Sequence, residues 1–265
     1  ILSAISVSGL IIGTMSMVIV LSVMNGFESI ITKMYNSFNP DFRIEAIKGK
    51  TIDISTFPID KIAAIKGIAS YSEIIEENAL LRYKNKQQIV TIKGVDQNFT
   101  KVSNIKSKVV EGKYLLQMRE ANFMVIGYGI FDKMEMGIND FKSPISVYIP
   151  KRDNTVTLDP TEAFNSELVF ASGAFSIQEE FDTKYAIIPL RLAKKLLDYK
   201  SEVTAIEIAI SNPENSDKIQ KQIKQFIGDN YQIKNRFEQQ EILYKIIKSE
   251  KFAIFLILSF IILIA

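Results

Sequence analysis

The chain contains no cysteine, no histidine and no tryptophan. It therefore forms no disulfide, and it lacks the side chains of structural zinc sites, thiol nucleophiles and histidine general bases. The absence of cysteine fits an oxidising and a reducing compartment alike, so it does not place the protein. The 32 basic and 30 acidic residues nearly cancel to a formal net charge of +2, which gives no reason to expect nucleic acid as a partner.

Charge is also missing from the opening segment ILSAISVSGLIIGTMSMVIVLSVMNGF, which runs from Ile1 to Phe27. A helix needs about 20 apolar residues to cross the hydrocarbon core of a bilayer, and a helix satisfies its own backbone amides there. A buried soluble helix of this length would carry some charge, and a secretory signal peptide would need a basic leader and a shorter apolar region. We therefore predict a transmembrane helix over residues 1–26.

The closing segment KFAIFLILSFIILIA is also apolar, but residues 251–265 are too few to span a bilayer alone. We expect them to be the start of a second transmembrane helix, and the chain to be a piece cut within both helices. Residues 27–250 lie between and show no low-complexity linker or internal repeat. This length suffices for one large domain or two small ones, on one side of the membrane.

Two amphipathic stretches flank the polar region. The spacing of the first predicts that the opening membrane helix continues into water and ends near Pro40. The second, EQQEILYKIIKSEKF from residue 238, predicts a helix that leads into the closing apolar segment. Short strands and helices alternate between them, with a hairpin that turns at Lys84-Asn85-Lys86. The pattern predicts an α+β fold: a mixed α/β domain of two subdomains on a stalk of two transmembrane helices. The amphipathic spacing of the first helix also includes Tyr35. The apolar stripes expected to pair in the stalk are Phe27, Ile30, Ile31, Met34 and Phe38 on the first helix, and Ile242, Leu243, Ile246 and Ile247 on the second.

Three short motifs have a functional and a structural interpretation. Gly127-Tyr128-Gly129 has the setting of a dinucleotide loop but lacks the third glycine at Asp132, so a tight strand-to-helix turn is preferred. The acid pairs Glu76-Glu77 and Glu179-Glu180 are interpreted as solvated strand ends and turns rather than acid–base catalysts. Gly9 and Gly13 in the first helix have the small-xxx-small spacing that lets another helix approach closely, although a lone span with incidental glycines is the alternative.

Residues 151–166 form a long connection between two predicted strands. Such loops tend to be functional or disordered. Leu158 and Phe164 are apolar among polar neighbours, and Pro160 stiffens the segment. A protruding binding hairpin and a mobile surface loop both fit this composition.

The stretch VLSVMNGFE, Val20 to Glu28, closely resembles the end of the first membrane helix in the lipoprotein-releasing ABC permeases of Gram-negative bacteria. These proteins form the LolC/LolE group of the MacB/FtsX-like permease superfamily. The layout of one span, a large periplasmic domain and a second span is also similar. The segment GYGIFDKMEMGINDFKSPISVYIP resembles the family's pattern of a glycine, a short helix, a turn and a strand that ends in proline.

This resemblance implies a multi-pass permease subunit in the bacterial inner membrane, with its soluble domain in the periplasm. Such a subunit extracts lipoproteins from the outer leaflet of the inner membrane and passes them to a periplasmic carrier for outer-membrane sorting. The chain itself would be neither an enzyme nor a cofactor protein, because ATP and Mg would be bound by a separate ATPase subunit. A second permease subunit, identical or different, would complete the transporter. The alternative is an FtsX-like or MacB-like mechanotransmission permease that regulates a periplasmic partner or drives efflux.

The resemblance also assigns roles to residues. It places the carrier-binding hook of the family at residues 151–166, where Leu158, Pro160 and Phe164 would contact the carrier. The first helix would line the cavity that holds the acyl chains of the substrate, and methionine suits such a wall because its side chain adapts its shape. The residues of this cavity would be Met15, Met17, Met24 and Phe27, and Gly9 and Gly13 would pack the helices together.

Overall fold

The computed structural model describes residues 2–35, 38–138, 140–151 and 163–264. Its contacts divide the chain into two compact units. One comprises Ile1–Asn36 with Arg236–Ala265, and the other comprises Ser37–Asn235. The helical unit and the sheet unit, as we call them, are described separately.

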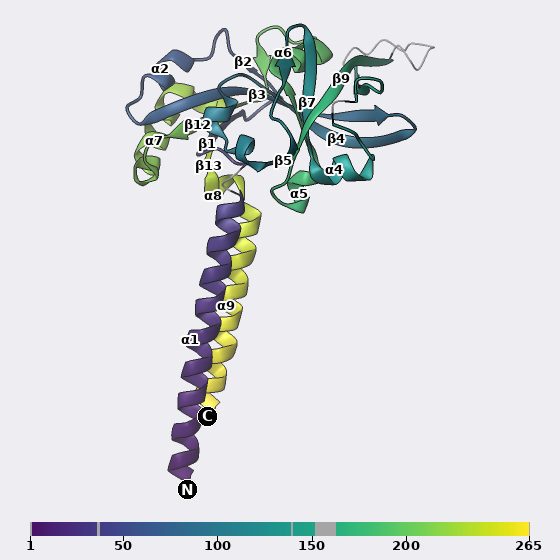
Figure 1. Cartoon of the computed structure of the whole chain (residues 1–265). Coiled ribbons are helices and arrows are strands. Elements are labelled where there is room, and N and C mark those ends of the chain that lie inside the picture. The colour runs from purple at the N-terminus through teal and green to yellow at the C-terminus, as the bar shows by residue number, and fades with distance from the viewer. Residues whose placement is uncertain (1, 36–37, 139, 152–162, 265) are drawn as a thin grey trace. The chain divides into compact units, whose positions relative to one another are not determined.

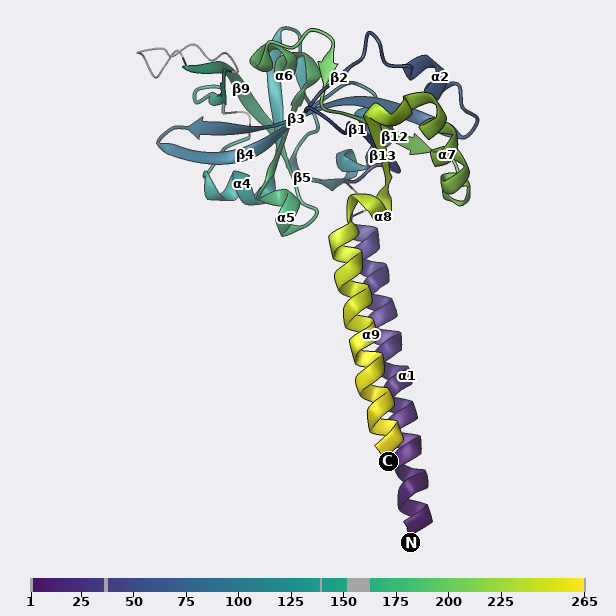
Figure 2. The same cartoon turned by 180° about the vertical axis from the view of Figure 1, so that it is seen from behind.

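The helical unit consists of α1 (Leu2–Tyr35), α8 (Arg236–Gln239) and α9 (Glu241–Ile264). Helices α1 and α9 lie side by side in both views (Figures 1 and 2). Among the described residues, Val7–Phe27 of α1 is the segment long and apolar enough to cross a membrane. The predicted N-terminal apolar helix is therefore confirmed.

The predicted apolar stripes are only partly buried. Phe27 and Ile30 on α1 are exposed, as are Ile242 and Ile246 on α9, whereas Ile247 is buried. The two helices pack against each other, and pairing through these stripes stays a prediction. The side chains of Ile31, Met34, Tyr35 and Leu243 lie outside the described ones.

Phe38 is also not part of the first helix, which ends at Tyr35. Its ring lies in the sheet unit, with its centroid 4.6 Å from that of Phe181 and 4.9 Å from that of Tyr185. Pro40 disfavours a helical conformation just before it. An aromatic cluster also buries the phenyl ring more completely than a helix surface in water, which explains why the predicted helical phase does not extend to Phe38.

The sheet unit is built from short strands and helices in mixed order. Its strands are β1 (Phe42–Ala46), β2 (Ile52–Asp53), β3 (Ile68–Tyr83), β4 (Lys86–Val95), β5 (Val109–Gly112), β6 (Gln117–Met118), β7 (Ala121–Gly127), β8 (Ile145–Pro150), β9 (Phe164–Phe175), β10 (Tyr185–Pro189), β11 (Glu202–Val203), β12 (Ala205–Ile210) and β13 (Tyr231–Asn235). Its helices are α2 (Ile59–Ala63), α3 (Phe99–Val102), α4 (Tyr128–Lys133), α5 (Glu179–Asp182), α6 (Leu190–Leu197) and α7 (Ser216–Ile227).

One sheet runs through the unit in the order β13-β1-β12-β3-β4-β10-β7-β9-β5, and β8 pairs with both β3 and β9. The pairs β4–β10 and β7–β9 are parallel, and the other pairs along this order are antiparallel. The α+β class is thus confirmed, and the two predicted subdomains would share this sheet. The first strand pairs with the last, with Phe42 opposite Asn235, so the chain enters and leaves the sheet on neighbouring strands.

Strands β3 and β4 form the long hairpin that the sequence predicts. Tyr83 pairs with Lys86, and Lys84 adopts a left-handed backbone conformation with φ 52° in the turn. Gly94 lies near the end of β4, where a Cβ atom would come within 2.3 Å of the Cβ of Ala193 on α6. A glycine is therefore required for α6 to pack closely on β4.

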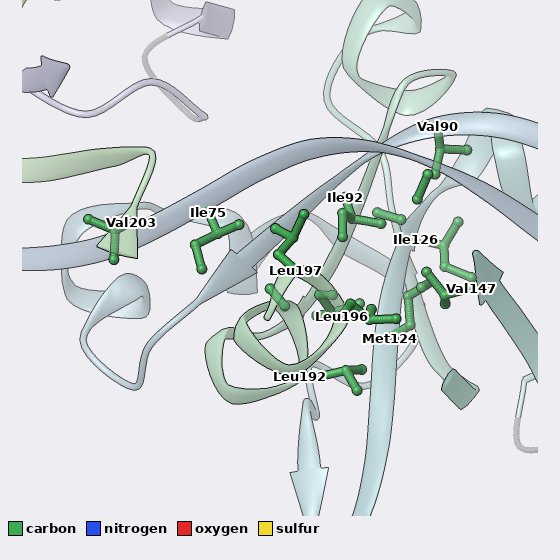
Figure 3. Close-up of a cluster of buried hydrophobic side chains, with 14 of the residues drawn as sticks. Ile75, Val90, Ile92, Met124, Ile126, Val147, Leu192, Leu196, Leu197 and Val203 are labelled. Carbon is green, nitrogen blue, oxygen red and sulfur yellow. The ribbon is translucent and has the colours of Figure 1, made fainter. Parts of the chain in front are cut away.

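The hydrophobic core lies between one face of the sheet and α6 (Figure 3). Alternate residues of the strands, such as Ile75 on β3 and Ile92 on β4, point to this face and are fully buried. Helix α6 presents Leu192 and Leu196 toward the same core. Burying each such side chain contributes roughly 1.5–3 kcal/mol.

The predicted strand-to-helix turn at Gly127 is confirmed, since β7 ends there and α4 begins at Tyr128. A Cβ atom at Gly127 would come within 2.2 Å of the carbonyl oxygen of Asp182 on α5. The glycine thus serves close packing of backbone against backbone. Helix α4 spans only six residues.

The predicted loop at residues 151–166 is the connection of an antiparallel hairpin. Strand β8 pairs with β9, with Pro150 opposite Phe164, and the amide of Lys151 donates to the carbonyl of Ala163 at 2.9 Å. Strand β9 begins at Phe164, two residues before the predicted end of the loop, because pairing with β8 continues to that point. Residues 152–162, including Leu158 and Pro160, lie outside the described residues.

Candidate functional site

The residues predicted to form an acyl-chain wall lie at different sides of α1. Met15 and Phe27 are more than half exposed, whereas Met17 and Met24 are half-buried. At 3.6 residues per turn, Met17 and Met24 lie on nearly the opposite side of the helix from Met15. Met15 therefore lies apart from Met17 and Met24, and acyl-chain binding by the four residues remains a prediction.

Helices α1 and α9 approach closely at Gly13. This glycine is buried, and a Cβ atom there would come within 2.9 Å of Cγ1 of Ile262. Gly9, one turn earlier, is half-buried on the same side of the helix. A polar contact joins the same two helices, because Nζ of Lys251 donates to Oδ1 of Asn25 in the MNGF stretch.

The β8–β9 hairpin carries an exposed apolar strip next to the predicted hook. Phe164 is 41% exposed and Leu168 is 59% exposed, and both lie on the same face of β9 because side chains alternate along a strand. Phe164 pairs with Pro150 at the base of the connection. Of the predicted hook residues, the structure thus places Phe164 at the base.

The base of this hairpin is held in place by polar contacts with α6. The amide nitrogen of the Asn165 side chain donates to the carbonyl of Leu196 at 2.9 Å and to Oδ2 of Asp198 at 3.0 Å. Lys195 on α6 forms an ion pair with Glu167. The loop between β8 and β9 therefore starts from a fixed scaffold, which is the usual arrangement for a binding loop.

The other face of the sheet carries paired charges on neighbouring strands. We call this group the charge network. Its members are Lys234 on β13, Glu45 and Arg43 on β1, Glu207 on β12, Glu76 on β3 and Lys93 on β4.

Arg43 lies at the centre of the charge network. Its guanidinium donates to both carboxylate oxygens of Glu76, at 2.8 and 3.1 Å, to Oε1 of Glu207 at 2.9 Å and to Oε1 of Glu45 at 2.7 Å. Nζ of Lys93 lies 2.7 Å from Oε1 of Glu207 and 3.3 Å from Oε1 of Glu76. Bidentate contacts of this kind are among the stronger ion pairs in proteins.

The charge network is buried at one end and partly open at the other. Lys93 and Glu207 are almost completely buried, and Nζ of Lys93 lies 4.5 Å from the ring centroid of Phe38 and 5.1 Å from that of Phe99. Such rings attract a cation through their negative faces. A cleft of about 290 Å³ opens at the other end, beside Arg43 and Glu45.

The neighbouring charges keep Glu76 ionised. Burial raises the pKa of Glu76, but attraction to Arg43 and Lys93 and their hydrogen bonds outweigh that effect and lower the pKa to about 2. For Arg43, burial disfavours the charged guanidinium and lowers its pKa, but the charges of Glu76 and Glu207 outweigh this effect and raise the pKa well above its ordinary value. The Arg43–Glu76 pair therefore remains charged at neutral pH.

The interpretation of Glu76 as a solvated residue is wrong, whereas Glu179 and Glu180 are exposed as predicted. Glu76 lies on the face of the sheet that Phe38 and Phe99 help to cover. The sequence around Glu76 does not show that these rings pack over that face. One sequence signal was available. A single charge stands inside each of the apolar strand segments VTIKGV and AIEIAI, and charges in such positions are usually paired. Among the described residues, no group of acidic side chains is placed to hold a metal ion.

Residues 3–226 match the model of a protein family described as the MacB-like periplasmic core domain. The chain belongs to this family. A MacB-like core domain is therefore present here together with an N-terminal apolar helix of membrane-spanning length.

Relatives of this MacB-like chain include proteins of lipoprotein release. It is 28% identical over 252 residues to the lipoprotein-releasing system transmembrane protein LolC of Buchnera aphidicola subsp. Schizaphis graminum, over 93% of this chain and 59% of that protein. It is 25% identical over 217 residues to the transmembrane protein LolE of Haemophilus influenzae, over 78% of this chain and 50% of that protein. The chain thus spans little more than half the length of these relatives.

Solved structures support the fold. The periplasmic region of MacB from Actinobacillus actinomycetemcomitans superposes with a TM-score of 0.52 at 13% identity, over 79% of this chain and 94% of that one. The extracellular domain of the ABC-type transporter YknZ from Gram-positive bacteria gives a TM-score of 0.50 at 11% identity, over 73% and 99%. These likenesses establish the MacB-like fold of the sheet unit and leave its activity to other arguments.

Proposed function

We propose that this chain is part of a permease subunit of an ABC transporter that extracts lipoproteins from the outer leaflet of the inner membrane and passes them to a periplasmic carrier. The observation that carries the proposal is the 28% identity to a lipoprotein-releasing LolC protein, which extends over 93% of this chain. The VLSVMNGFE stretch at the end of the apolar helix adds to it.

In this proposal the chain binds partners and transmits motion, and it performs no chemistry. A separate ATPase subunit would bind ATP and Mg and hydrolyse the nucleotide, and a second permease subunit would complete the transporter. The sheet unit would lie in the periplasm, and α1 with the uncharged end of α9, Phe252–Ile264, would form a membrane-embedded stalk. An FtsX-like regulator or a MacB-like efflux component is the alternative, since the fold is shared with MacB.

The proposed topology is tested by labelling. Asn85 is exposed in the turn between β3 and β4, so a cysteine there is expected to react with a membrane-impermeant maleimide in intact spheroplasts. The chain has no native cysteine, so the signal comes from that position alone. Labelling that requires cell lysis would place the sheet unit in the cytoplasm and refute the topology.

The proposed carrier contact is tested at the hairpin connection. Replacing Leu158 and Phe164 together with aspartate is expected to abolish crosslinking to the periplasmic carrier, because apolar anchors in polar surroundings often supply most of an interface's binding energy. Phe164 is already partly exposed, so the sheet unit is expected to stay folded.

A matched control replaces Ile89 on the β3–β4 hairpin and Phe226 on α7, which are also exposed, with aspartate. This variant is expected to crosslink as the unchanged protein does. Undiminished crosslinking of the Leu158 and Phe164 variant would show that the carrier binds elsewhere. If no variant, the unchanged protein included, crosslinks to a carrier, the function in lipoprotein release is itself contradicted.

A further inference from the structure

The charge network begins at the strands on which the chain enters and leaves the sheet unit. Lys234 lies on β13 and Glu45 on β1, and Nζ of Lys234 is 3.1 Å from Oε2 of Glu45. The network ends at Lys93 on β4, and strands β1, β12 and β3 lie between β13 and β4. A continuous path of ion pairs therefore crosses this part of the sheet.

Members of this path share partners, so a change at one of them alters the pairing of the others. Glu45 contacts both Lys234 and Arg43, and Oε1 of Glu207 accepts from both Arg43 and Lys93. The second oxygen of Glu207, Oε2, is buried and accepts no hydrogen bond within the described part of the chain. It is a further acceptor on a carboxylate that both Arg43 and Lys93 already contact, so the charges have more than one way to pair.

Stability alone does not account for this arrangement. Buried ion pairs can often be replaced by apolar side chains without loss of stability, because desolvation offsets much of their attraction. Strand β1 is already held on its other face by Phe42 and Ile44, which are completely buried in the core. When ion pairs share their members, the strength of each pair depends on whether the other pairs are formed.

We propose that the charge network acts as one cooperative brace, which couples the strands where the chain enters and leaves the sheet unit to strand β4 in its interior. Phe38 completes the brace, because its ring lies over Lys93 and Phe38 precedes β1 by only a few residues. A displacement of β1 or β13 then changes the ion pairs of Lys93 while the core stays folded. This inference goes beyond the proposed function, since it depends only on contacts within the sheet unit.

The test is a double-substitution cycle at the two ends of the network, read by hydrogen exchange of the full chain in detergent micelles. The variants are Lys234→Met, Lys93→Met and the two combined. The amides of β1 report local opening of that strand, and those of β7, outside the network, report global unfolding. Lys234 and Lys93 lie on strands that are not neighbours, so independent effects on the β1 exchange rate would multiply.

With a cooperative brace, each single substitution speeds exchange in β1 relative to β7. The combined variant then exchanges about as fast as the faster single variant, at least about threefold slower than the product of the two effects. The control pairs Lys234→Met with Lys86→Met, because Lys86 binds Glu135 outside the network, and here the effects are expected to multiply.

Multiplying effects of Lys234→Met and Lys93→Met would overturn the proposal, and so would equal acceleration in β1 and β7. If Lys93→Met does not fold, Glu76→Gln takes its place in the same cycle. That substitution keeps the shape of the side chain, and Glu76 is partly exposed, at 18%. The same two outcomes then decide the question.

Discussion

Replacing Glu207 with alanine is expected to destabilise the protein by about 3–5 kcal/mol, as measured by urea denaturation of the full chain in detergent and followed by tyrosine fluorescence. Glu207 is completely buried, and its Oε1 neutralises both Arg43 and the buried Lys93. Without it, the ammonium of Lys93 keeps its longer ion pair with Glu76 and its contacts with two aromatic rings, but loses its shortest ion pair. An insufficiently paired buried charge is far more costly than the loss of the pair itself.

The matched control is Glu135→Ala, which removes the partner of Lys86 in an ion pair of 2.8 Å. Glu135 is 78% exposed, so this substitution is expected to change the free energy of unfolding far less than Glu207→Ala does. A combined replacement of Lys93 by methionine and Glu207 by leucine is expected to recover much of the stability lost in Glu207→Ala. If Glu207→Ala costs as little as Glu135→Ala, water must reach Lys93 and the network is not buried in solution.

Inserting a flexible Gly-Ser segment after Ile31 of α1 is expected to abolish lipoprotein release by the assembled transporter while ATP hydrolysis continues. Under the proposed function, motion generated by the ATPase reaches the sheet unit through α1, and a continuous helix is stiff whereas a Gly-Ser segment is not. The measurement compares ATP turnover with the rate of lipoprotein release in proteoliposomes that contain both permease subunits and the ATPase.

The control places the same segment after Asn85, in the exposed turn between β3 and β4, where release is expected to proceed normally. Crosslinking of the carrier to the α1 insertion variant is expected to remain, because the β8–β9 connection is unchanged. Release at the normal rate in the α1 variant would show that α1 serves only as a tether.

Local patterns in the sequence predict the elements of this fold well. The uncharged run from Ile1 to Phe27, the hairpin turn at Lys84-Asn85-Lys86 and the short turn at Gly127 all appear as predicted. Each depends on residues close in sequence, where apolar spacing and backbone preferences decide the structure. The boundary of the first helix is less well predicted, because Phe38 leaves the helical pattern to join Phe181 and Tyr185.

The charge network shows what local patterns do not reveal. Arg43 and Glu207 are separated by 164 positions in sequence, and their contact depends on the placement of β12 beside β1. An isolated charge within an apolar strand indicates that a partner exists, but not which residue it is. The predicted hook and acyl-chain residues depend on partners outside this chain, so the fold alone does not test them.

The pairing of β1 with β13 has a consequence for how such a protein can be rearranged. Facing residues of an antiparallel pair have Cα atoms only about 4.5–5.5 Å apart, and Phe42 faces Asn235. The two ends of the sheet unit are therefore close enough for a few residues to join them. A segment with adjacent ends can be transplanted between two helices of another membrane protein, or have its termini relocated to an exposed turn such as Asn85, without breaking the order of its strands. The sheet unit can therefore be exchanged as a whole between two helices. Its surface loops can change in sequence without any change in the helices that precede and follow it.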